Sequence, residues 1–227
     1  MSKQTVHHAT LENGIILLAE CLPGLESVAV AFHTPAGSVH DPRGCSGLAT
    51  LTGEMMLRGA GDRDGRRIVD DLEGAGVQWS QGVTTSHTSF SGGMVAKQLP
   101  VALPIYADIL QRPLLDGNEL EKARQVVLQS LAGIEDDPSH RVISALRQLM
   151  FPAPWGHPAE GISADVENLA ISDVKSFVNQ HVCPSATIIA AAGCIEWNDF
   201  LHQTEDLFGH WATKNQAAVD TQKRGPR

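Results

Sequence analysis

An Asn-Gly pair at positions 13 and 14 joins two short apolar runs, residues 6–11 and 15–22, and this arrangement restricts how the chain can begin to fold. Asn and Gly tolerate the positive φ angles that a tight turn between antiparallel strands requires. Residues 27–34 alternate as a third strand would, and the apolar run 186–192 predicts a buried strand near the C-terminus. The sequence therefore predicts a sheet that begins with a hairpin.

Between these strands the apolar spacing changes to that of helices. Leu48, Leu51 and Met55 predict a helix within residues 47–59. Paired strands are expected at 77–82 and 87–95, and further helices at 62–75, 99–110, 116–137, 141–150, 171–181 and 197–208. With 42% hydrophobic residues the chain can build one core. We expect one domain over residues 1–213 and a polar linker or disordered tail over 214–227.

Charge and cysteine content narrow the classes of function. A net charge of -9 argues against nucleic acid and against an anionic membrane as partners. The sequence shows no apolar stretch of membrane-spanning length and no secretory signal at residues 1–5, so a cytoplasmic location is expected. Cys21, Cys45, Cys183 and Cys194 form no C-x-x-C pair, which favours reduced, small core residues over disulfides or a zinc knuckle.

The helix at residues 47–59 reads Gly-Leu-Ala-Thr-Leu-Thr-Gly-Glu-Met-Met-Leu-Arg-Gly. It resembles the metal helix of the pitrilysin/insulinase-type (M16, inverted-zincin) zinc peptidases, which include the mitochondrial processing peptidases. Those enzymes carry H-x-x-E-H within Gly-Leu-Ala-His-x-x-Glu-His-Met. By this resemblance Thr50 stands at the first His, Gly53 at the catalytic Glu and Glu54 at the second His.

The family's third zinc ligand is a Glu on a later helix, in a segment that this chain matches at residues 121–131. By the resemblance the ligand position falls on Ser130, and Ala123 replaces a supporting acid. Catalytic zinc needs three ligands from His, Asp, Glu or Cys, and hydroxyl groups are poor substitutes. We therefore predict no catalytic residue, no metal ligand and no cofactor, although active family members use zinc. Thr50, Gly53, Glu54 and Ser130 are vestigial positions.

A second matching segment, residues 76–90, follows the family pattern Gly-x-x-x-x-Ala-x-Thr-x-x-x-x-Thr-x-Tyr/Phe. In the family this segment lines the cleft as a strand to which an extended substrate can add. The resemblance makes this stretch a candidate peptide-binding edge strand, and an ordinary solvent-facing hairpin is an equal alternative. The candidate residues are Thr84, Thr85, His87, Thr88 and Phe90.

The resemblance covers nearly the whole domain and implies an α/β, two-layer sandwich, with a mixed, mostly antiparallel sheet and helices packed on one face. It also implies a pseudo-peptidase that binds a peptide substrate and pairs with an active M16 subunit or a second homologous domain. One alternative is a zinc metalloendopeptidase with a rearranged site, formed by Glu54 with His33, His40 or His87. Another alternative is a structural core subunit of a larger complex.

Overall fold

The computed structural model describes residues 5–212, and its centre is a six-stranded sheet in the order β1-β2-β8-β3-β7-β6. All neighbours are antiparallel except β2 and β8, which are parallel. A separate two-stranded ribbon pairs β4 (Gly59–Ala60) with β5 (Arg63–Asp64). The strands of the sheet are β1 (Thr5–Thr10), β2 (Ile16–Cys21), β3 (Ser27–Thr34), β6 (Gln78–Val83), β7 (Thr88–Val95) and β8 (Ile188–Gly193).

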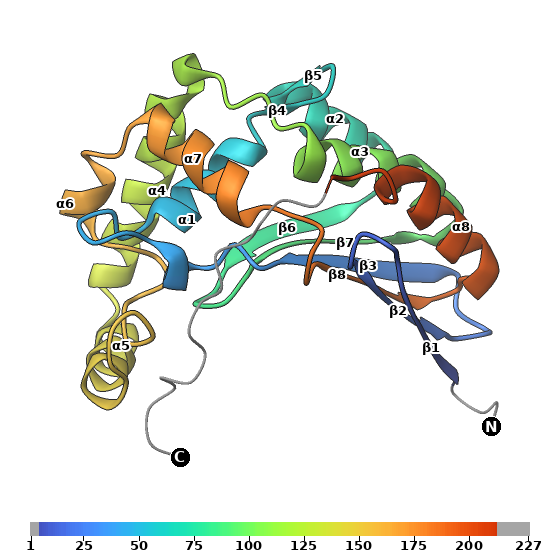
Figure 1. The fold of residues 1–227 in the computed structure, drawn as a ribbon, viewed down its shortest axis with the longest axis horizontal. Helices are drawn as coiled ribbons and strands as arrows, with labels where there is room; N and C mark the ends of the chain where they lie inside the picture. Colours follow the sequence, from blue (N-terminus) through green and yellow to red (C-terminus); the bar gives the residue numbers. More distant parts are fainter. Residues whose placement is uncertain (1–4, 213–227) are drawn as a thin grey trace.

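Helices form a layer over one face of this sheet, and the opposite face is open (Figure 1). The two-layer α/β fold expected from the sequence is therefore confirmed. The helices are α1 (Leu48–Met56), α2 (Gly65–Gly74), α3 (Leu99–Gln111), α4 (Leu120–Glu135), α5 (Pro138–Met150), α6 (Ser163–Val166), α7 (Ile171–His181) and α8 (Trp197–Phe208), with 3-10 turns η1 (Ser38–His40), η2 (Ala96–Gln98) and η3 (Gly117–Glu119).

The first hairpin forms as predicted, with Gly14 at φ +89° in the turn. Asn13 has a second role that its turn propensity does not indicate. Its side-chain Nδ2 donates to the carbonyl oxygens of Phe208, at 2.7 Å, and Trp211, at 3.2 Å. The amide therefore satisfies carbonyls at the C-terminal end of α8, and it ties the start of the chain to its last helix.

Three helix starts differ from the expectation because local caps decide them. α2 begins at Gly65, since the ribbon β4–β5 takes up the preceding residues and Asp64 accepts a hydrogen bond from Arg67 N at 2.8 Å. The turn η3 precedes α4, with Asp116 accepting from Asn118 N. α5 begins at Pro138, since Asp137 accepts from Ser139 N at 2.9 Å.

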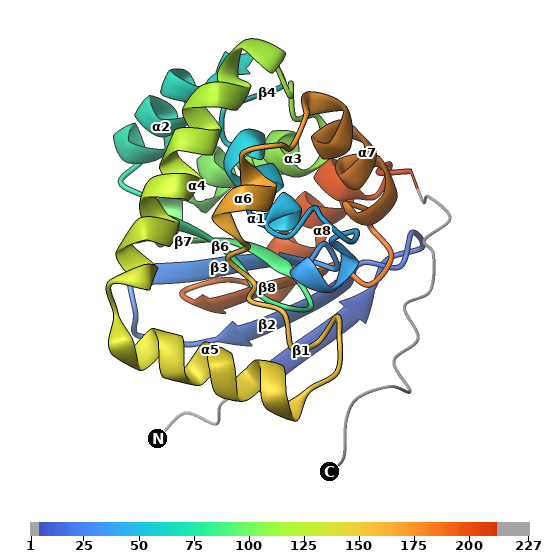
Figure 2. The ribbon, with the colours of Figure 1, turned by 90° about the vertical axis from the view of Figure 1, so that its left-hand side faces the viewer.

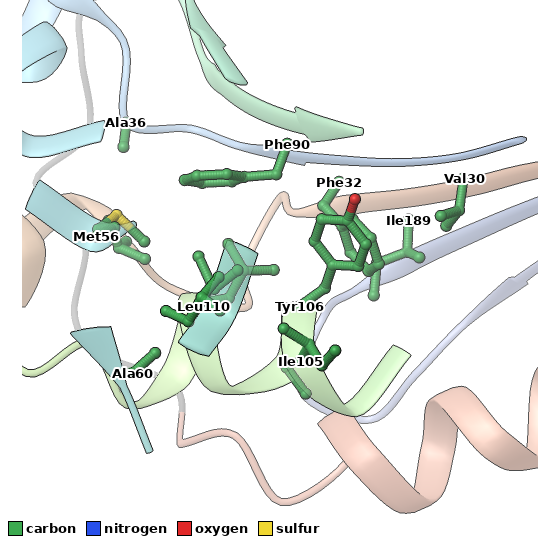
Figure 3. Packing of buried hydrophobic residues seen from close by; sticks show 14 of the residues in the cluster. Val30, Phe32, Ala36, Met56, Ala60, Phe90, Ile105, Tyr106, Leu110 and Ile189 are labelled. Atoms are coloured by element: carbon green, nitrogen blue, oxygen red, sulfur yellow. The ribbon is translucent and has the colours of Figure 1, made fainter. Parts of the chain in front are cut away.

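The core lies between the sheet and the helix layer, with residues from α1, α3, α4, α7 and α8 among others, and Figure 3 shows part of it around α3. The rings of Phe32 and Tyr106 stack with centroids 4.7 Å apart, and Phe208 lies 5.9 Å from Phe32. Tyr106 donates its hydroxyl to the carbonyl of Ser91 at 2.9 Å, which satisfies the polar end of a buried ring. Burial raises the pKa of this hydroxyl above its ordinary value.

Other predictions from the sequence concern membrane-spanning helices, the cysteines and the domain limit. Within residues 5–212, no helix combines the length and apolarity that crossing a bilayer requires. The four cysteines all lie in the described part and form no disulfide among themselves. Cys194 is exposed and so is not the core residue that was expected, whereas Cys183 is buried. The predicted domain limit at 213 and the tail 214–227 lie outside the described residues.

Gly133 lies on the exposed side of α4, and a Cβ added there would meet no atom within 4 Å. Glycine weakens a helix because it loses more backbone entropy on folding than alanine does. We expect Gly133→Ala to raise the free energy of unfolding by about 0.5 to 1 kcal/mol. Urea denaturation of the variant and the unchanged chain measures the difference. A variant that is less stable than the unchanged chain by the same amount would contradict the prediction.

Candidate functional site

Helix α1 is held at its start by a carboxylate from the preceding loop. Asp41 accepts hydrogen bonds from Gly47 N at 2.8 Å and Ala49 N at 2.9 Å. Gly47 has φ +101°, and a Cβ there would lie 2.6 Å from a methyl group of Val166. Burial raises the pKa of Asp41 to about 7, against the hydrogen bonds that lower it. The helix is therefore placed by its own loop and by α6.

At two of the positions where the family has zinc ligands, this chain carries the hydroxyl groups of Thr50 and Ser130, and the two hydroxyls lie in different surroundings. Thr50 is half-buried and donates its hydroxyl to the carbonyl of Ala159 at 2.9 Å. Ser130 lies on α4 and is exposed. Ala123, at the supporting acidic position, is fully buried in the interior of the domain. Thr50 thus satisfies a backbone carbonyl and Ala123 packs in the core, and the two hydroxyls of Thr50 and Ser130 are weak zinc donors.

The carboxylate of Glu54 is paired within the same helix turn. Its Oε1 accepts from Arg58 Nη2 at 2.6 Å and from Arg58 Nε at 3.1 Å. Arg58 Nη1 also lies 4.0 Å from Glu119 Oε2, at the start of α4. The side chains of Glu54 and Arg58 are about a quarter exposed. Metal binding at Glu54 would therefore compete with an ion pair that is already formed.

Gly53 leaves a space that a side chain of the edge strand occupies. A Cβ on Gly53 would lie 2.2 Å from Nε2 of Gln81 and 3.4 Å from a methyl group of Val83. The Gln81 Nε2 atom is buried and has no hydrogen-bond partner among the described residues. In the family pattern quoted above, the position of Gln81 is Ala. Gln81, which is larger than the Ala of the family pattern, thus lies against the place where Gly53 has no side chain.

The sequence alone does not reveal the contact between Gln81 and Gly53, although it contains a signal for it. Gln81 departs from the Ala of the family pattern, and Val83 departs from its first Thr. Only the contact with Gly53, which lies on a different element, shows what the departure does.

The residues at the family's metal positions do not fit zinc, since they offer two hydroxyl groups, one paired carboxylate and no side chain at Gly53. In the described part of the chain, no three His, Cys, Asp or Glu residues lie together as a metal-binding group. Among residues 5–212, Glu54 is thus not gathered with His33, His40 or His87 into a group of three such side chains. His33 instead packs against His87, with ring centroids 4.9 Å apart, and His40 stacks on another histidine.

None of the five residues expected at a peptide-binding edge lies on an edge strand of the sheet. β6 is one of the two edge strands and β1 is the other, whereas β7 pairs with β3 on one side and with β6 on the other, so its backbone hydrogen-bonding groups are already paired. Phe90 is a buried core residue, and Thr88 donates its hydroxyl to the carbonyl of Ala36 at 2.6 Å. Thr84, Thr85 and His87 lie in the turn between β6 and β7.

Beside β6 lies a cavity of about 740 Å³. Trp79 and Gln81 of the edge strand line it, together with Glu54 and Arg58 of the α1 region. A chain laid along the outer edge of β6 would pass beside this cavity. The remaining lining residues are Leu57, Asp64, Gly65, Arg66, Val69, Leu114, Asp116, Glu119 and Lys122.

A pair of stacked histidines, the half-buried His40 and the buried His181, lies near the start of α1. The rings of His40 and His181 stack with centroids 4.1 Å apart, and His181 Nδ1 has no hydrogen-bond partner among the described residues. Burial, and then the neighbouring His40, lower the pKa of His181 to about 4. Burial also lowers the pKa of His40. Both rings are therefore held neutral in the folded chain near pH 7.

This shift predicts a pH dependence of stability. An unfolded histidine takes up a proton near pH 6.5, whereas folded His181 takes one up only near pH 4. Acidification from pH 6.5 to 4 should therefore lower the free energy of unfolding, by up to roughly 3 kcal/mol from this group. His181→Phe should flatten the slope. Urea denaturation at several pH values gives the free energy of unfolding of the variant and of the unchanged chain. The difference between the two chains cancels the opposite contribution of Asp41, which both contain. Equal slopes of this free energy against pH in the two chains would refute the prediction.

Comparison with known proteins agrees with the fold. The family model described as Insulinase (Peptidase family M16) matches residues 18–159. The chain is 25% identical over 207 residues to a protein of Rickettsia bellii named Uncharacterized zinc protease, a match that covers 91% of this chain and 50% of that protein. It is 28% identical over 215 residues to Cytochrome b-c1 complex subunit 1, mitochondrial, of Bos taurus, which covers 93% and 44%.

Among solved structures, the chain is similar to a peptidase M16 inactive domain from Pseudomonas fluorescens. The TM-score is 0.84 at 18% sequence identity, and the match covers 95% of this chain and 53% of that chain. The chain spans about half the length of the curated relatives it matches. Because the family model matches more than half of its residues, this chain belongs to the insulinase family, peptidase family M16.

Proposed function

We propose that this chain is a non-catalytic M16 domain that binds an extended peptide and pairs with a second M16 domain. The observation that carries the proposal is that the family's zinc and catalytic positions hold Thr50, Gly53, Glu54 and Ser130, none of which is suited to its former role. One similar solved structure is described as an inactive domain, and the bovine relative is named as a subunit of a complex. A cytoplasmic location stays a prediction.

The edge strand supports the peptide-binding part of the proposal. An extended peptide can add to an exposed sheet edge through main-chain hydrogen bonds, and its alternate side chains then enter pockets beside the edge. β6 supplies such an edge, and the 740 Å³ cavity lies beside it. Trp79 and Gln81 are two residues apart on β6, so their side chains lie on the same face, and both line the cavity. Every second side chain of a peptide added to this edge would therefore reach the cavity.

The test is to incubate the purified chain with a tryptic digest of casein and to identify the retained peptides by mass spectrometry. Zinc content is measured by elemental analysis on the same sample. We expect retained, uncleaved peptides and less than about a tenth of an equivalent of zinc, since catalytic zinc is normally bound too tightly to wash away. Cleavage that a chelator abolishes would overturn the proposal. A chain that retains no peptide would favour a purely structural subunit.

Trp79 offers a direct check of where the peptide lies. Its side chain is half-buried at the cavity, and truncating an aromatic residue at a binding surface commonly costs more than 1 kcal/mol. We expect Trp79→Ala to weaken binding of a retained peptide by about tenfold in isothermal titration calorimetry. Trp197→Ala is the matched control, because Trp197 stacks on His7 on the β1 side of the sheet. Equal effects of both variants would place the peptide elsewhere.

A further inference from the structure

Two histidine rings meet where strand β3 approaches the turn between β6 and β7. His33 alternates along β3 with the buried Phe32, which packs on α3, so the His33 side chain lies on the open face of the sheet. His87 directly precedes β7, and its ring meets that of His33 edge to face, with 80° between the two planes. The end of β3 and this turn lie at the same end of the sheet (Figures 1 and 2). The fold thus brings together two imidazoles from separate segments.

The turn fixes which nitrogen of His87 carries the proton. Thr84 Oγ1 donates its proton to the carbonyl oxygen of His87 at 3.1 Å. Because this hydroxyl has a single proton, it can only accept from His87 Nδ1, which lies 3.0 Å away. Ser86 Oγ lies 3.1 Å from the same nitrogen. His87 Nδ1 is therefore the protonated nitrogen, and Nε2 keeps the free electron pair that a metal ion requires.

The second ring has a nitrogen without a partner. His33 Nδ1 is buried and has no hydrogen-bond partner among residues 5–212. The loop at Gly37 packs directly against His87 N, and on the two sides of this contact Ser38 Oγ and Thr85 Oγ1 are also buried without a partner among the described residues. Buried polar atoms are nearly always hydrogen-bonded, so three unpartnered atoms at one junction indicate a place for an ion and its coordinated water.

The spacing of the two rings fits a shared metal ion. Imidazole nitrogen binds zinc at about 2.0 to 2.1 Å, so two imidazoles on one tetrahedral ion have ring centroids about 5 Å apart. The centroids of His33 and His87 are 4.9 Å apart, whereas the stacked rings of His40 and His181 are closer, at 4.1 Å. Burial, and then His33, lower the pKa of His87, so this ring is neutral near pH 7, as metal binding requires.

We propose that His33 and His87 form a binding site for a divalent transition-metal ion such as Zn²⁺, Ni²⁺ or Cu²⁺, held by two imidazoles and completed by water. Imidazole suits these ions, whereas Mg²⁺ and Ca²⁺ prefer oxygen ligands. The site uses none of the positions where the family holds zinc, and it does not rest on the proposed function. With two protein ligands instead of three, the ion is held more weakly than catalytic zinc, so desalting removes it, in agreement with the low zinc content expected above.

Isothermal titration calorimetry of the purified full chain with zinc sulfate, in a buffer without chelator, tests the site. We expect one equivalent to bind with a dissociation constant in the micromolar range. His33→Ala and His87→Ala should each weaken binding by at least about tenfold, because each removes one of the two protein ligands. His202→Ala, at an exposed histidine of α8, is the matched control and should leave the affinity unchanged. Zinc binding that persists in both test variants, or that is absent from the unchanged chain, would overturn the proposal.

A second measurement needs no variant and so does not depend on how a substitution affects folding. Pulsed electron paramagnetic resonance of the unchanged chain, loaded with less than one equivalent of Cu²⁺, counts the imidazoles on the ion through their remote nitrogens. Two imidazoles are expected. A count of one or none would contradict the two-histidine site.

Thr84 is assigned a positioning role through the His87 tautomer. Thr84→Val removes the hydroxyl and should weaken zinc binding by about tenfold, since groups that orient a metal-binding histidine commonly contribute 10- to 100-fold. Thr84→Ser keeps the hydroxyl and should restore the affinity, which a role in packing alone would not do. Equal zinc affinities of the valine and serine variants would overturn the role assigned to Thr84.

Discussion

The variant Thr50→His/Glu54→His/Ser130→Glu is expected to bind about one equivalent of zinc, against less than about a tenth for the unchanged chain. It places two imidazoles one helical turn apart on α1 and a carboxylate on α4, and these two helices are in contact. The substitution at Thr50 removes one hydrogen bond, to Ala159, at a cost of about 1 kcal/mol. Elemental analysis after desalting measures the result.

The matched control keeps both histidines and substitutes Ser130→Ala in place of Ser130→Glu. This control lacks the third ligand and should lose most of the bound zinc. Equal zinc in both variants would show that α4 does not supply the ligand position that the resemblance implies.

Hydrolysis should require a further change at Gly53 and at Gln81 together. With Gln81 in place, the Cβ of a glutamate at position 53 would lie 2.2 Å from the Gln81 amide nitrogen. We expect Gly53→Glu on the zinc-binding background to cleave a fluorogenic peptide only when Gln81→Ala is also present, because a general base must reach the zinc-bound water. Equal activity with Gln81 retained would mean that this side chain moves aside freely.

Gly37→Ala is expected to lower the free energy of unfolding by about 2 to 4 kcal/mol. A Cβ on Gly37 would lie 2.3 Å from the backbone carbon of Ser86 and 2.4 Å from His87 N and from the carbonyl oxygen of Thr85. These are backbone atoms, so no side-chain rotation relieves the overlap. The loss is a large part of the roughly 5 to 15 kcal/mol that stabilises a typical domain.

The loop that holds Gly37 is bound to the turn between β6 and β7 by Ser38 N to Thr84 O, at 3.1 Å, and Val39 N to Thr85 O, at 2.9 Å. The Gly37→Ala variant should therefore also loosen the end of the edge strand. Gly133→Ala makes the same chemical change in open space and is the control in the same urea titration. A loss below about 0.5 kcal/mol at Gly37 would contradict the packing described here.

Much of the fold follows from local patterns. The hairpin at Asn13 and Gly14, the strand β3 and the helices α1, α3 and α7 were all predictable because turn propensity and apolar periodicity act over a few residues. The emptied positions on α1 were equally visible, since Thr50, Gly53 and Glu54 lie within a single stretch of chain. The prediction that this chain lacks suitable zinc ligands thus needed only the sequence and its resemblance.

Contacts between distant segments decided the rest. β7 became an interior strand because Phe32 of β3 pairs with Phe90, 58 positions later in the chain, which no local pattern encodes. No local pattern encodes the contact of Gln81 with Gly53 or the outward orientation of the apolar side of α5 either. The sequence by itself determined most of the elements and which residues stand at the positions that the resemblance assigns to zinc ligands. Only the tertiary structure decided that β7 is an interior strand and that the apolar side of α5 is exposed within residues 5–212, because pairing and burial depend on residues that meet only after folding.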